Sequence, residues 1–307
     1  MLLQPPQPLK CLSFNLLHGG PLSGRVGPAQ HLERRLEIVI QELQSLNVDI
    51  IGLQEASSSR GRGNIAARIA AQLGFQYVYA PSSSRVFASE KLNTAIARVM
   101  NFTEGPAIVS RFPILHSQVY DIPHCGLFPN PRVLLRTQLQ TPWGQLWACS
   151  THISSDPCQA YAVAQLLHDQ YDSLPLIVMG DFNAQEHSSN MTHLIREAGL
   201  IDTFRTANPI TSGCTVDQHV YASHPTAFGR VNYVFLRPGA NTPGQTRTSR
   251  IVLNTPRRFP DGQVLWPSDH YGVLTEADVF SSVIKRAEER HYNTNLSLYA
   301  RIGEKLG

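Results

Sequence analysis

The chain has 307 residues, of which 42% are hydrophobic and 16% are charged. These proportions exclude an intrinsically disordered protein and are typical of a soluble globular protein that can bury a sizeable core. The net charge of +3 is mildly basic, so it permits a polyanionic substrate without requiring one.

Strand-like and helix-like segments alternate through most of the sequence. The helices are predicted from apolar residues at helical spacing and from end signals such as Asp156-Pro157, a capping residue followed by proline in the first turn. Strands are predicted at residues 9–17, 48–54, 75–80, 93–100, 106–110, 114–120, 133–141, 145–152, 174–180, 230–236 and 271–279. Helices are predicted at residues 30–46, 64–74, 156–171 and 189–198.

This order of elements predicts a mixed α/β protein with many antiparallel connections rather than strict βαβ alternation. We find no internal repeat and no low-complexity linker, so one domain over residues 9–279 is expected. Residues 1–8 would be an N-terminal extension. Residues 280–307 would form a helix on the domain edge and a loose polar tail. A monomer is expected, and an oligomer contact through the tail is the less favoured alternative.

The cysteines and the N-terminus bear on the compartment. No cysteine pair has CxxC spacing, and Cys11 and Cys149 lie in apolar runs where cysteine packs as a small hydrophobe. We therefore expect neither a disulfide framework nor a zinc site, and a reducing compartment fits better. The first ten residues do not resemble a signal peptide, and no apolar stretch is long enough to span a membrane. A cytoplasmic protein without a transmembrane segment is the expectation.

Hydrogen-bonding and ionisable side chains follow five separate apolar runs. If the strands lie alongside each other in the same sense, these side chains converge at one edge of the structure. Taken singly, each has an ordinary explanation as a turn, a loop acid or a buried histidine; their joint occurrence at strand ends is what points to a site. The residues are Asn15, Glu55, His152, the pair Asp181 and Asn183, and the pair Asp269 and His270.

The residue types in this set suggest a hard divalent cation. Glu55, Asn15 and Asp269 supply oxygen ligands, which Mg²⁺ prefers, and Mn²⁺ is an alternative. No cysteine or paired-histidine spacing points to zinc. Because magnesium keeps much of its water, one or two carboxylates together with a substrate phosphate is the expected arrangement.

The remaining residues suggest hydrolysis. Asp181 could take a proton from an attacking water or hold that water in line. Asn183 offers an amide N–H to a developing oxyanion, and His152 can add to that. The charge and tautomer of His270 can be set by the adjacent Asp269. Together these roles describe metal-assisted hydrolysis of a phosphate ester.

Seven stretches carry a resemblance to a known family. They occur in the family's order between residues 9 and 278 and read LSFNLLHGG, DIIGLQE, EGPAIVSRFPI, STHIS, IVMGDFNA, GRVNYVF and PSDHYGV. With them the chain resembles the endonuclease/exonuclease/phosphatase superfamily of magnesium-dependent phosphoesterases. The resemblance implies an α/β (α+β) fold, a four-layer αββα sandwich of two packed mixed β-sheets with helices outside, and an active site at one edge.

The resemblance also implies a role for each matched residue. Glu55 would bind the metal with Asn15 beside it and Asp269 at the metal edge. Asp181 would activate or orient water, and Asn183 would orient the phosphate. The two histidines would complete the site: His270 would contact the scissile phosphate, and His152 matches the second histidine of the nuclease and sphingomyelinase branches.

One matched position departs from the family pattern. The family usually has aspartate in the stretch GRVNYVF, where this chain has Asn232, and that aspartate normally pairs with the last histidine. An amide can accept the same hydrogen bond but carries no charge to stabilise an imidazolium. His270 should then lose its proton more easily, and reduced activity or a shifted pH dependence is expected. A catalytically silent protein and an asparagine without consequence are the alternatives.

The substrate is less well defined by the sequence. A phosphodiester, as in a nuclease, is the first expectation; the WCDRI-type stretch of inositol-phosphate phosphatases is absent. Arg60, Arg62 and Arg257 could bind phosphate, although solvated loop arginines are at least as well favoured. Arg111 matches a family position and is expected to be structural or at the site edge.

No long basic or aromatic-interleaved patch marks a dedicated nucleic-acid surface, so nucleic acid is one partner among others. A lipid-headgroup phosphodiesterase is an alternative if Leu127 and Phe128, in a proline-rich loop, dip into a membrane surface. Packing of this loop on its own domain is favoured over that reading. A silent binding module is the other alternative.

Overall fold

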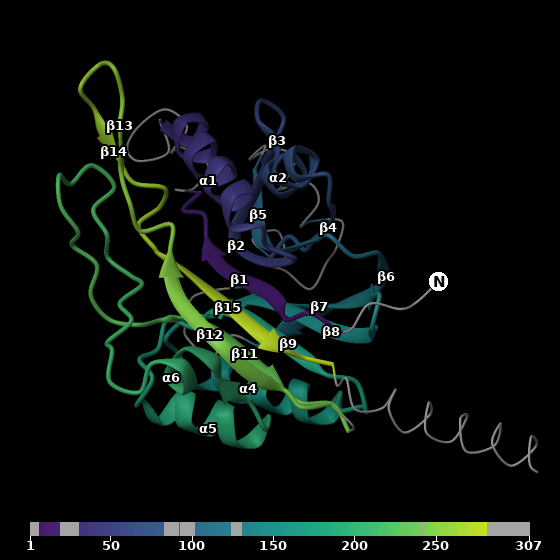
Figure 1. Cartoon of the computed structure of the whole chain (residues 1–307). Helices are drawn as coiled ribbons and strands as arrows, with labels where there is room; N and C mark the ends of the chain where they lie inside the picture. The colour runs from purple at the N-terminus through teal and green to yellow at the C-terminus, as the bar shows by residue number, and fades with distance from the viewer. Residues whose placement is uncertain are drawn as a thin grey trace, which may run out of the picture.

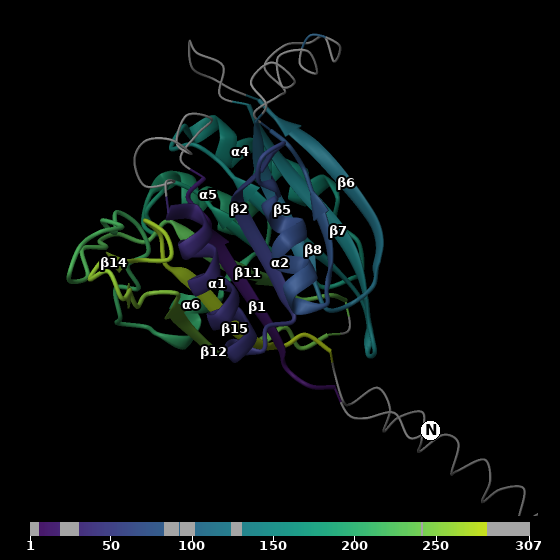
Figure 2. The ribbon, with the colours of Figure 1, turned by 90° about the horizontal axis from the view of Figure 1, so that it is seen from above.

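Two mixed β-sheets pack face to face in the computed structural model, and helices cover both outer faces (Figure 1). The structure describes residues 6–18, 31–82, 92, 102–123, 131–240 and 242–280. Viewed from above, α1 and α2 lie over one sheet and α4 and α5 over the other (Figure 2). The αββα sandwich expected from the sequence is therefore confirmed.

The first sheet consists of β1 (Leu9–Asn15), β2 (Ile50–Ser59), β3 (Gly63–Asn64), β4 (Gln76–Tyr79), β5 (Thr103–Ser110), β12 (Gln245–Val252) and β15 (Gly272–Asp278). Its order is β12-β15-β1-β2-β5-β4, with the short β3 beside β2. β1 and β2 are parallel. β15 is antiparallel to β1, so the start of β15 lies at the same edge as the end of β1.

The second sheet consists of β6 (Ile114–Ile122), β7 (Arg132–Thr141), β8 (Gly144–His152), β9 (Leu176–Asp181), β10 (Ile201–Asp202) and β11 (Asn232–Arg237). Its order is β10-β11-β9-β8-β7-β6. β8 and β9 are parallel, and β11 is antiparallel to β9. A separate two-stranded ribbon joins β13 (Arg257–Arg258) to β14 (Val264–Leu265).

The helices bury one apolar stripe each. On the first sheet, Leu36 and Leu43 of α1 share a core cluster with Leu53 of β2. On the second sheet, α4 and α5 pack over β8, β9 and β11, and Asp156 caps α4 as expected, accepting from Cys158 N at 3.2 Å. The helices are α1 (Leu32–Leu46), α2 (Ile65–Leu73), α4 (Pro157–Asp169), α5 (Ser189–Glu197) and α6 (Thr203–Ala207).

A glycine of β2 lets the first sheet pack closely against β9 of the second. A Cβ atom placed on Gly52 would lie 2.5 Å from the Cβ of Met179. Both residues are buried, and Met179 belongs to the core between the sheets. Gly52 precedes Glu55 by three residues and Met179 precedes Asp181 by two, so this close contact lies near both carboxylates in the chain.

Some elements differ from the sequence expectations. β12 was not predicted, because its sequence QTRTSRIV is polar; it forms the edge of the first sheet, where one side faces solvent. The short β10 and α6 and the β13–β14 ribbon were also not predicted. The strand predicted at 93–100 and the C-terminal helix predicted after Phe280 lie outside the described residues.

The cysteines correct one expectation. Cys158 is disulfide-bonded, whereas Cys11, Cys149 and Cys214 carry free thiols. This bond runs against the expectation of a reducing compartment, and cysteine usage no longer argues for one. In the described part of the chain, no helix is both long and apolar enough to cross a lipid bilayer.

The close contact of the sheets gives a first prediction. Gly52→Ala should lower the free energy of unfolding by about 1–3 kcal/mol, because the added methyl group collides with Met179 in a packed core. Urea denaturation monitored by circular dichroism measures this. Gly61→Ala is the matched control: a Cβ there meets no atom within 4 Å, so stability should change by less than about 0.5 kcal/mol. Equal effects of the two substitutions would contradict this account.

Candidate active site

Three strand ends and a bulge within a fourth strand meet at one edge of the sandwich. Asn15 is the last residue of β1, His152 of β8 and Asp181 of β9. Glu55 lies in β2 beside a bulge between Leu53 and Ala56, and its φ is +53°. This backbone conformation is rare for a non-glycine residue, and such outliers gather at functional sites.

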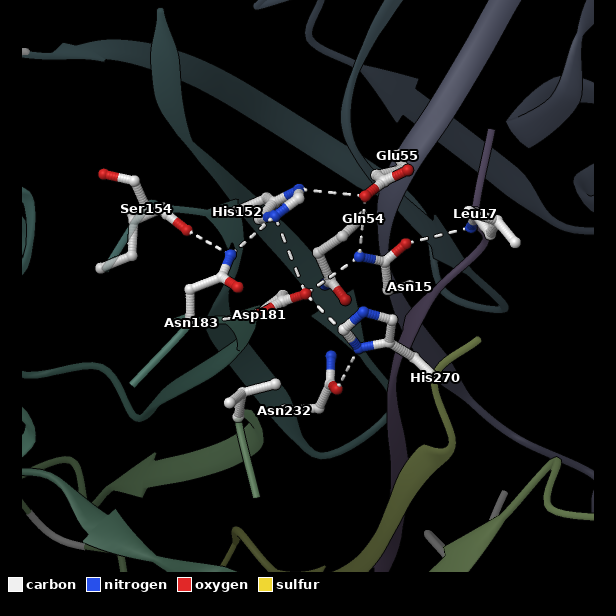
Figure 3. A network of polar contacts seen from close by, with 12 residues as sticks. Asn15, Leu17, Gln54, Glu55, His152, Ser154, Asp181, Asn183, Asn232 and His270 are labelled. Atoms are coloured by element: carbon white, nitrogen blue, oxygen red, sulfur yellow. Dashed lines mark hydrogen bonds and ion pairs between the residues drawn. The ribbon is translucent and has the colours of Figure 1, made fainter. Parts of the chain in front are cut away.

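Two more residues of the site lie at or just before the starts of strands that run in the opposite direction. Asn232 is the first residue of β11 and lies directly opposite Asp181 in the antiparallel pair. His270 lies two residues before β15 and is buried. The starts of β11 and β15 thus lie beside the ends of β1, β8 and β9. The structure brings the predicted side chains together at this edge (Figure 3).

The carboxylate of Asp181 is the centre of the cluster and is 1% exposed. Its Oδ2 atom accepts from Asn15 Nδ2 at 2.9 Å and lies 3.7 Å from His152 Nε2 and 3.5 Å from His270 Nδ1. Its Oδ1 atom accepts from the backbone N–H of Asn183 at 3.1 Å. The carboxylate therefore has a fixed orientation, with one oxygen facing two imidazole rings.

Glu55 receives its hydrogen bonds from β1 and the segment after it. Its Oε1 atom accepts from Asn15 Nδ2 at 3.2 Å, and its Oε2 atom accepts from His18 N at 3.2 Å and lies 3.3 Å from His18 Nε2. Burial acts to raise the pKa of Glu55, but interactions with His152 and His18 and the Asn15 hydrogen bond outweigh it, so the net shift is downward. Glu55 is thus ionised at neutral pH.

His152 is held as a neutral ring. Burial, as the main cause, lowers its pKa to about 4. Asn183 Nδ2 lies 3.1 Å from His152 Nε2 and donates to Ile153 O at 2.8 Å. Nε2 then accepts a hydrogen, so the proton of the neutral ring is on Nδ1, which lies 3.9 Å from Glu55 Oε1.

Both amide hydrogens of Asn183 are used in these contacts. The sequence suggested that this amide donates to a developing oxyanion. In this arrangement Asn183 instead holds the ring of His152. The left-handed φ of +48° at Asn183 turns its side chain back toward β8 and makes this contact possible.

His270 pairs with the residue that departs from the family pattern. Its Nδ1 atom lies 2.8 Å from Asn232 Oδ1, and its Nε2 atom lies 3.9 Å from Asp269 Oδ1. Asn232 is fully buried, and its Nδ2 atom has no hydrogen-bond partner among the described residues. The amide therefore accepts the hydrogen bond expected of it and has a donor left over.

The oxygen atoms suited to a divalent cation are those of Glu55, Asn15 and Asp269. Burial chiefly raises the pKa of Asp269, and the negative charge of Glu55 raises it further, so the two carboxylates repel each other. A cation between them would relieve this repulsion, and its preferred ligands are such oxygens. The donor set therefore fits a hard metal ion, although no group of three or more His, Cys, Asp or Glu side chains within the described ranges is preassembled around one.

The arginines expected to bind phosphate or to lie at the site edge do not gather around this cluster. Arg111 forms an ion pair with Asp49 at 3.0 Å, just before β2 begins, which is the end of that strand opposite to Glu55. Arg257 lies in β13 and bonds Gln41 of α1. Arg60 and Arg62 lie in the turn after β2, on the site side of that strand, and Arg60 is exposed. These arginines therefore do not form the phosphate-binding group that the sequence led us to expect.

The structure adds residues that the sequence analysis did not select. His18 lies between two carboxylates, 3.3 Å from Glu55 Oε2 and 3.7 Å from Glu104 Oε2. Burial, reinforced by the charge of Glu55, raises the pKa of Glu104 to about 7, and Arg132 opposes this shift. His18 and Glu104 both lie in quoted family stretches, LSFNLLHGG and EGPAIVSRFPI, so closer attention to those stretches could have found them.

Solved structures with the same fold were found by comparison. A protein of the endonuclease/exonuclease/phosphatase family from Leptotrichia buccalis aligns with a TM-score of 0.63 at 17% identity, covering 88% of this chain and 99% of that one. The mannosyl-6-phosphatase of Bacteroides thetaiotaomicron gives 0.62 at 17% identity, covering 88% and 99%. A truncated TDP2 of Caenorhabditis elegans gives 0.60 at 16% identity, covering 88% and 97%.

At these identities the structural neighbours show the fold alone. No curated protein matches the sequence. Residues 12–270 match the endonuclease/exonuclease/phosphatase family, and this range runs from β1 to the last residue of the site, His270. The chain therefore belongs to the endonuclease/exonuclease/phosphatase family, whose members are phosphoester hydrolases.

Proposed function

We propose that this chain hydrolyses a phosphate ester in a Mg²⁺-dependent reaction, with a water molecule attacking the phosphorus atom. The observation that supports this most is the buried carboxylate of Asp181, fixed by Asn15 and the Asn183 N–H with one oxygen facing two imidazoles. A fixed acceptor of this kind can orient a water molecule and take its proton.

The metal would be held by Glu55, Asn15 and Asp269, with Mn²⁺ as an alternative to Mg²⁺. When bound, it would supply Lewis acidity at a phosphoryl oxygen. Glu55 suits this role because its carboxylate is ionised and its two oxygens are aimed by Asn15 and by the His18 N–H.

The two histidines would act on the phosphate from different sheets, His152 from the end of β8 and His270 from the segment before β15. The neutral ring of His152 has its hydrogen on Nδ1, an atom without a hydrogen-bond partner among the described residues, so it can donate to a phosphate oxygen. The ring of His270 is oriented by Asn232 Oδ1 and lies within 3.5 Å of Asp181, close enough to contact the same phosphate. Charge developing in the transition state is thereby met by donors that are already in place.

The class of phosphate ester that the site accepts is a separate question. The sequence suggested a phosphodiester, with nucleic acid as one candidate, but Arg111 and Arg257 pair with Asp49 and Gln41 and lend that choice no support. Leu127 and Phe128, on which a lipid-surface substrate depended, lie outside the described residues. A silent binding module would bind metal or phosphate without turnover.

The protonation of Glu104 also matters for the metal site. With a pKa of about 7 it carries a proton for much of the time at neutral pH, which leaves Glu55 as the more fully charged carboxylate of this pair. His18, between the two, contacts both. The negative charge near the proposed ligand Glu55 therefore depends on whether Glu104 is protonated.

The activity itself is the second prediction. The purified protein should hydrolyse bis-p-nitrophenyl phosphate or p-nitrophenyl phosphate in Mg²⁺ and lose this activity in EDTA. His270→Ala and Asp181→Ala should each lower kcat/KM by about a hundredfold or more, because each removes a group placed at the reacting phosphate. His116→Ala, an exposed histidine on β6, is the control and should keep full activity. Turnover that survives EDTA, or that Asp181→Ala leaves intact, would refute the proposal.

Glu104 gives the third prediction, for the metal-free protein. Its folded pKa is raised above the unfolded value, so the wild type loses stability as pH rises through about 7. Glu104→Gln removes this titration. The variant should therefore gain stability relative to the wild type between pH 5 and pH 8, by about 1–3 kcal/mol. Urea unfolding at both pH values in EDTA measures the difference; a difference that does not change with pH would show that Glu104 is already ionised at pH 5.

A further inference from the structure

The ring of His18 lies between two carboxylates beside the cluster. Its Nε2 atom is 3.3 Å from Glu55 Oε2 and 3.7 Å from Glu104 Oε2. A ring nitrogen that faces two acceptors carries a hydrogen. The side chain is 17% exposed, and its ring packs against that of Phe102 with 5.1 Å between the centroids. The ring is therefore held in a position from which Nε2 presents a hydrogen to Glu55.

The backbone of the same residue contacts the same oxygen. His18 N donates to Glu55 Oε2 at 3.2 Å. The chain reaches this position through a turn in which Leu17 has a left-handed φ of +50° and its N–H donates to Asn15 Oδ1 at 3.0 Å. Arg35 fixes the turn by donating to Leu17 O at 2.7 Å. Glu55 Oε2 thus meets two nitrogens of one residue.

The two oxygens of Glu55 face different neighbours. Oε1 accepts from Asn15 Nδ2 at 3.2 Å and lies 3.9 Å from His152 Nδ1 (Figure 3). Because Asn15 also donates to Asp181, Oε1 is directed toward the cluster. Oε2 is directed toward His18. His18 therefore occupies one oxygen of the carboxylate and leaves the other, Oε1, for the proposed cation.

The number of carboxylate oxygens open to a metal ion affects which ion is preferred. Ca²⁺ takes roughly six to eight ligands and accepts a carboxylate through one or both oxygens, whereas Mg²⁺ requires near-ideal octahedral geometry at about 2.0–2.1 Å. A glutamate with one open oxygen suits Mg²⁺ and denies Ca²⁺ a second contact. Side chains that hold a metal ligand in place typically change metal affinity by about ten- to a hundredfold.

We propose that His18 is a positioning residue of the metal site: its ring holds Glu55 Oε2, so that Glu55 binds the cation through Oε1 alone and the site favours Mg²⁺ over Ca²⁺. Glu104 of β5 takes part in this, because its carboxylate is the second acceptor that faces the ring nitrogen. The inference rests on the proposed function, in which Glu55 binds the metal.

The test compares the binding of two ions to four proteins. Dissociation constants of Mg²⁺ and of Ca²⁺ are obtained from the rise in melting temperature with metal concentration for the wild type, His18→Ala, His18→Gln and His116→Ala. His18→Ala should weaken Mg²⁺ binding about tenfold or more and Ca²⁺ binding much less, because Oε2 becomes open to the larger ion. The backbone N–H of residue 18 remains in every variant, so the comparison reports on the ring.

Two variants serve as controls. His18→Gln carries an N–H donor at about the position of Nε2 and should restore most of the preference for Mg²⁺. His116→Ala, at an exposed position on β6, should match the wild type for both ions.

Three outcomes would overturn the inference. Equal weakening of both ions in His18→Ala would identify a merely structural role, and unchanged binding of both would show that the ring has no role. The third is a wild type that binds Ca²⁺ as tightly as Mg²⁺, a result that does not depend on how well a variant folds.

Glu55→Ala separates this inference from the proposed function. If it leaves Mg²⁺ affinity unchanged, Glu55 is not a ligand and the role of His18 is overturned together with the proposed metal site. If Glu55→Ala weakens Mg²⁺ binding and His18→Ala changes the ion preference in a wild type that hydrolyses neither p-nitrophenyl ester, the role of His18 is supported while the proposed hydrolysis fails. Hydrolysis with an unchanged ion preference in His18→Ala would overturn the role of His18 alone.

Discussion

The amide of Asn15 is the interaction on which the rest of the site depends. Asn15 is the last residue of β1 in the first sheet. Its Nδ2 group donates to Glu55 in the same sheet and to Asp181 in the second sheet. Its Oδ1 atom accepts from Leu17 N at 3.0 Å, so the amide cannot rotate freely. Two buried carboxylates this close would repel each other, and a donor shared between them offsets that repulsion while fixing their separation.

A buried arginine, Arg35, stabilises the backbone segments next to this edge. Arg35 of α1 is 1% exposed and donates to Leu16 O at 2.8 Å, to Leu17 O at 2.7 Å and to Pro267 O at 3.1 Å. Burial lowers its pKa to about 10, so it remains charged at neutral pH. The Arg35 side chain thus links the segment after Asn15 to the segment before Asp269. Both segments adjoin proposed metal ligands, and no strand pairing among the described residues joins them directly.

The sequence allowed the sandwich and most of the cluster to be anticipated, because a polar residue at the end of an apolar run is a local signal. Asn15, His152 and Asp181 carry that signal. The roles of arginines depend on tertiary pairing, which a local pattern does not contain: Arg111 follows an apolar run just as Asp181 does, yet it pairs with Asp49 at the far end of its sheet. Glu104 was overlooked because its raised pKa arises from burial beside Glu55, a residue distant in sequence.

Asp181 illustrates how the backbone decides which atom can react. Its Oδ1 atom accepts from the N–H of Asn183 two residues on, the pattern of an aspartate that stabilises its own turn, and Asn183 takes a left-handed φ of +48° there. That oxygen is committed to holding the turn. Only Oδ2 is left to face Asn15 and the two imidazoles. The strained turn that ends β9 therefore leaves one carboxylate oxygen for chemistry and determines the direction from which a proton can reach it.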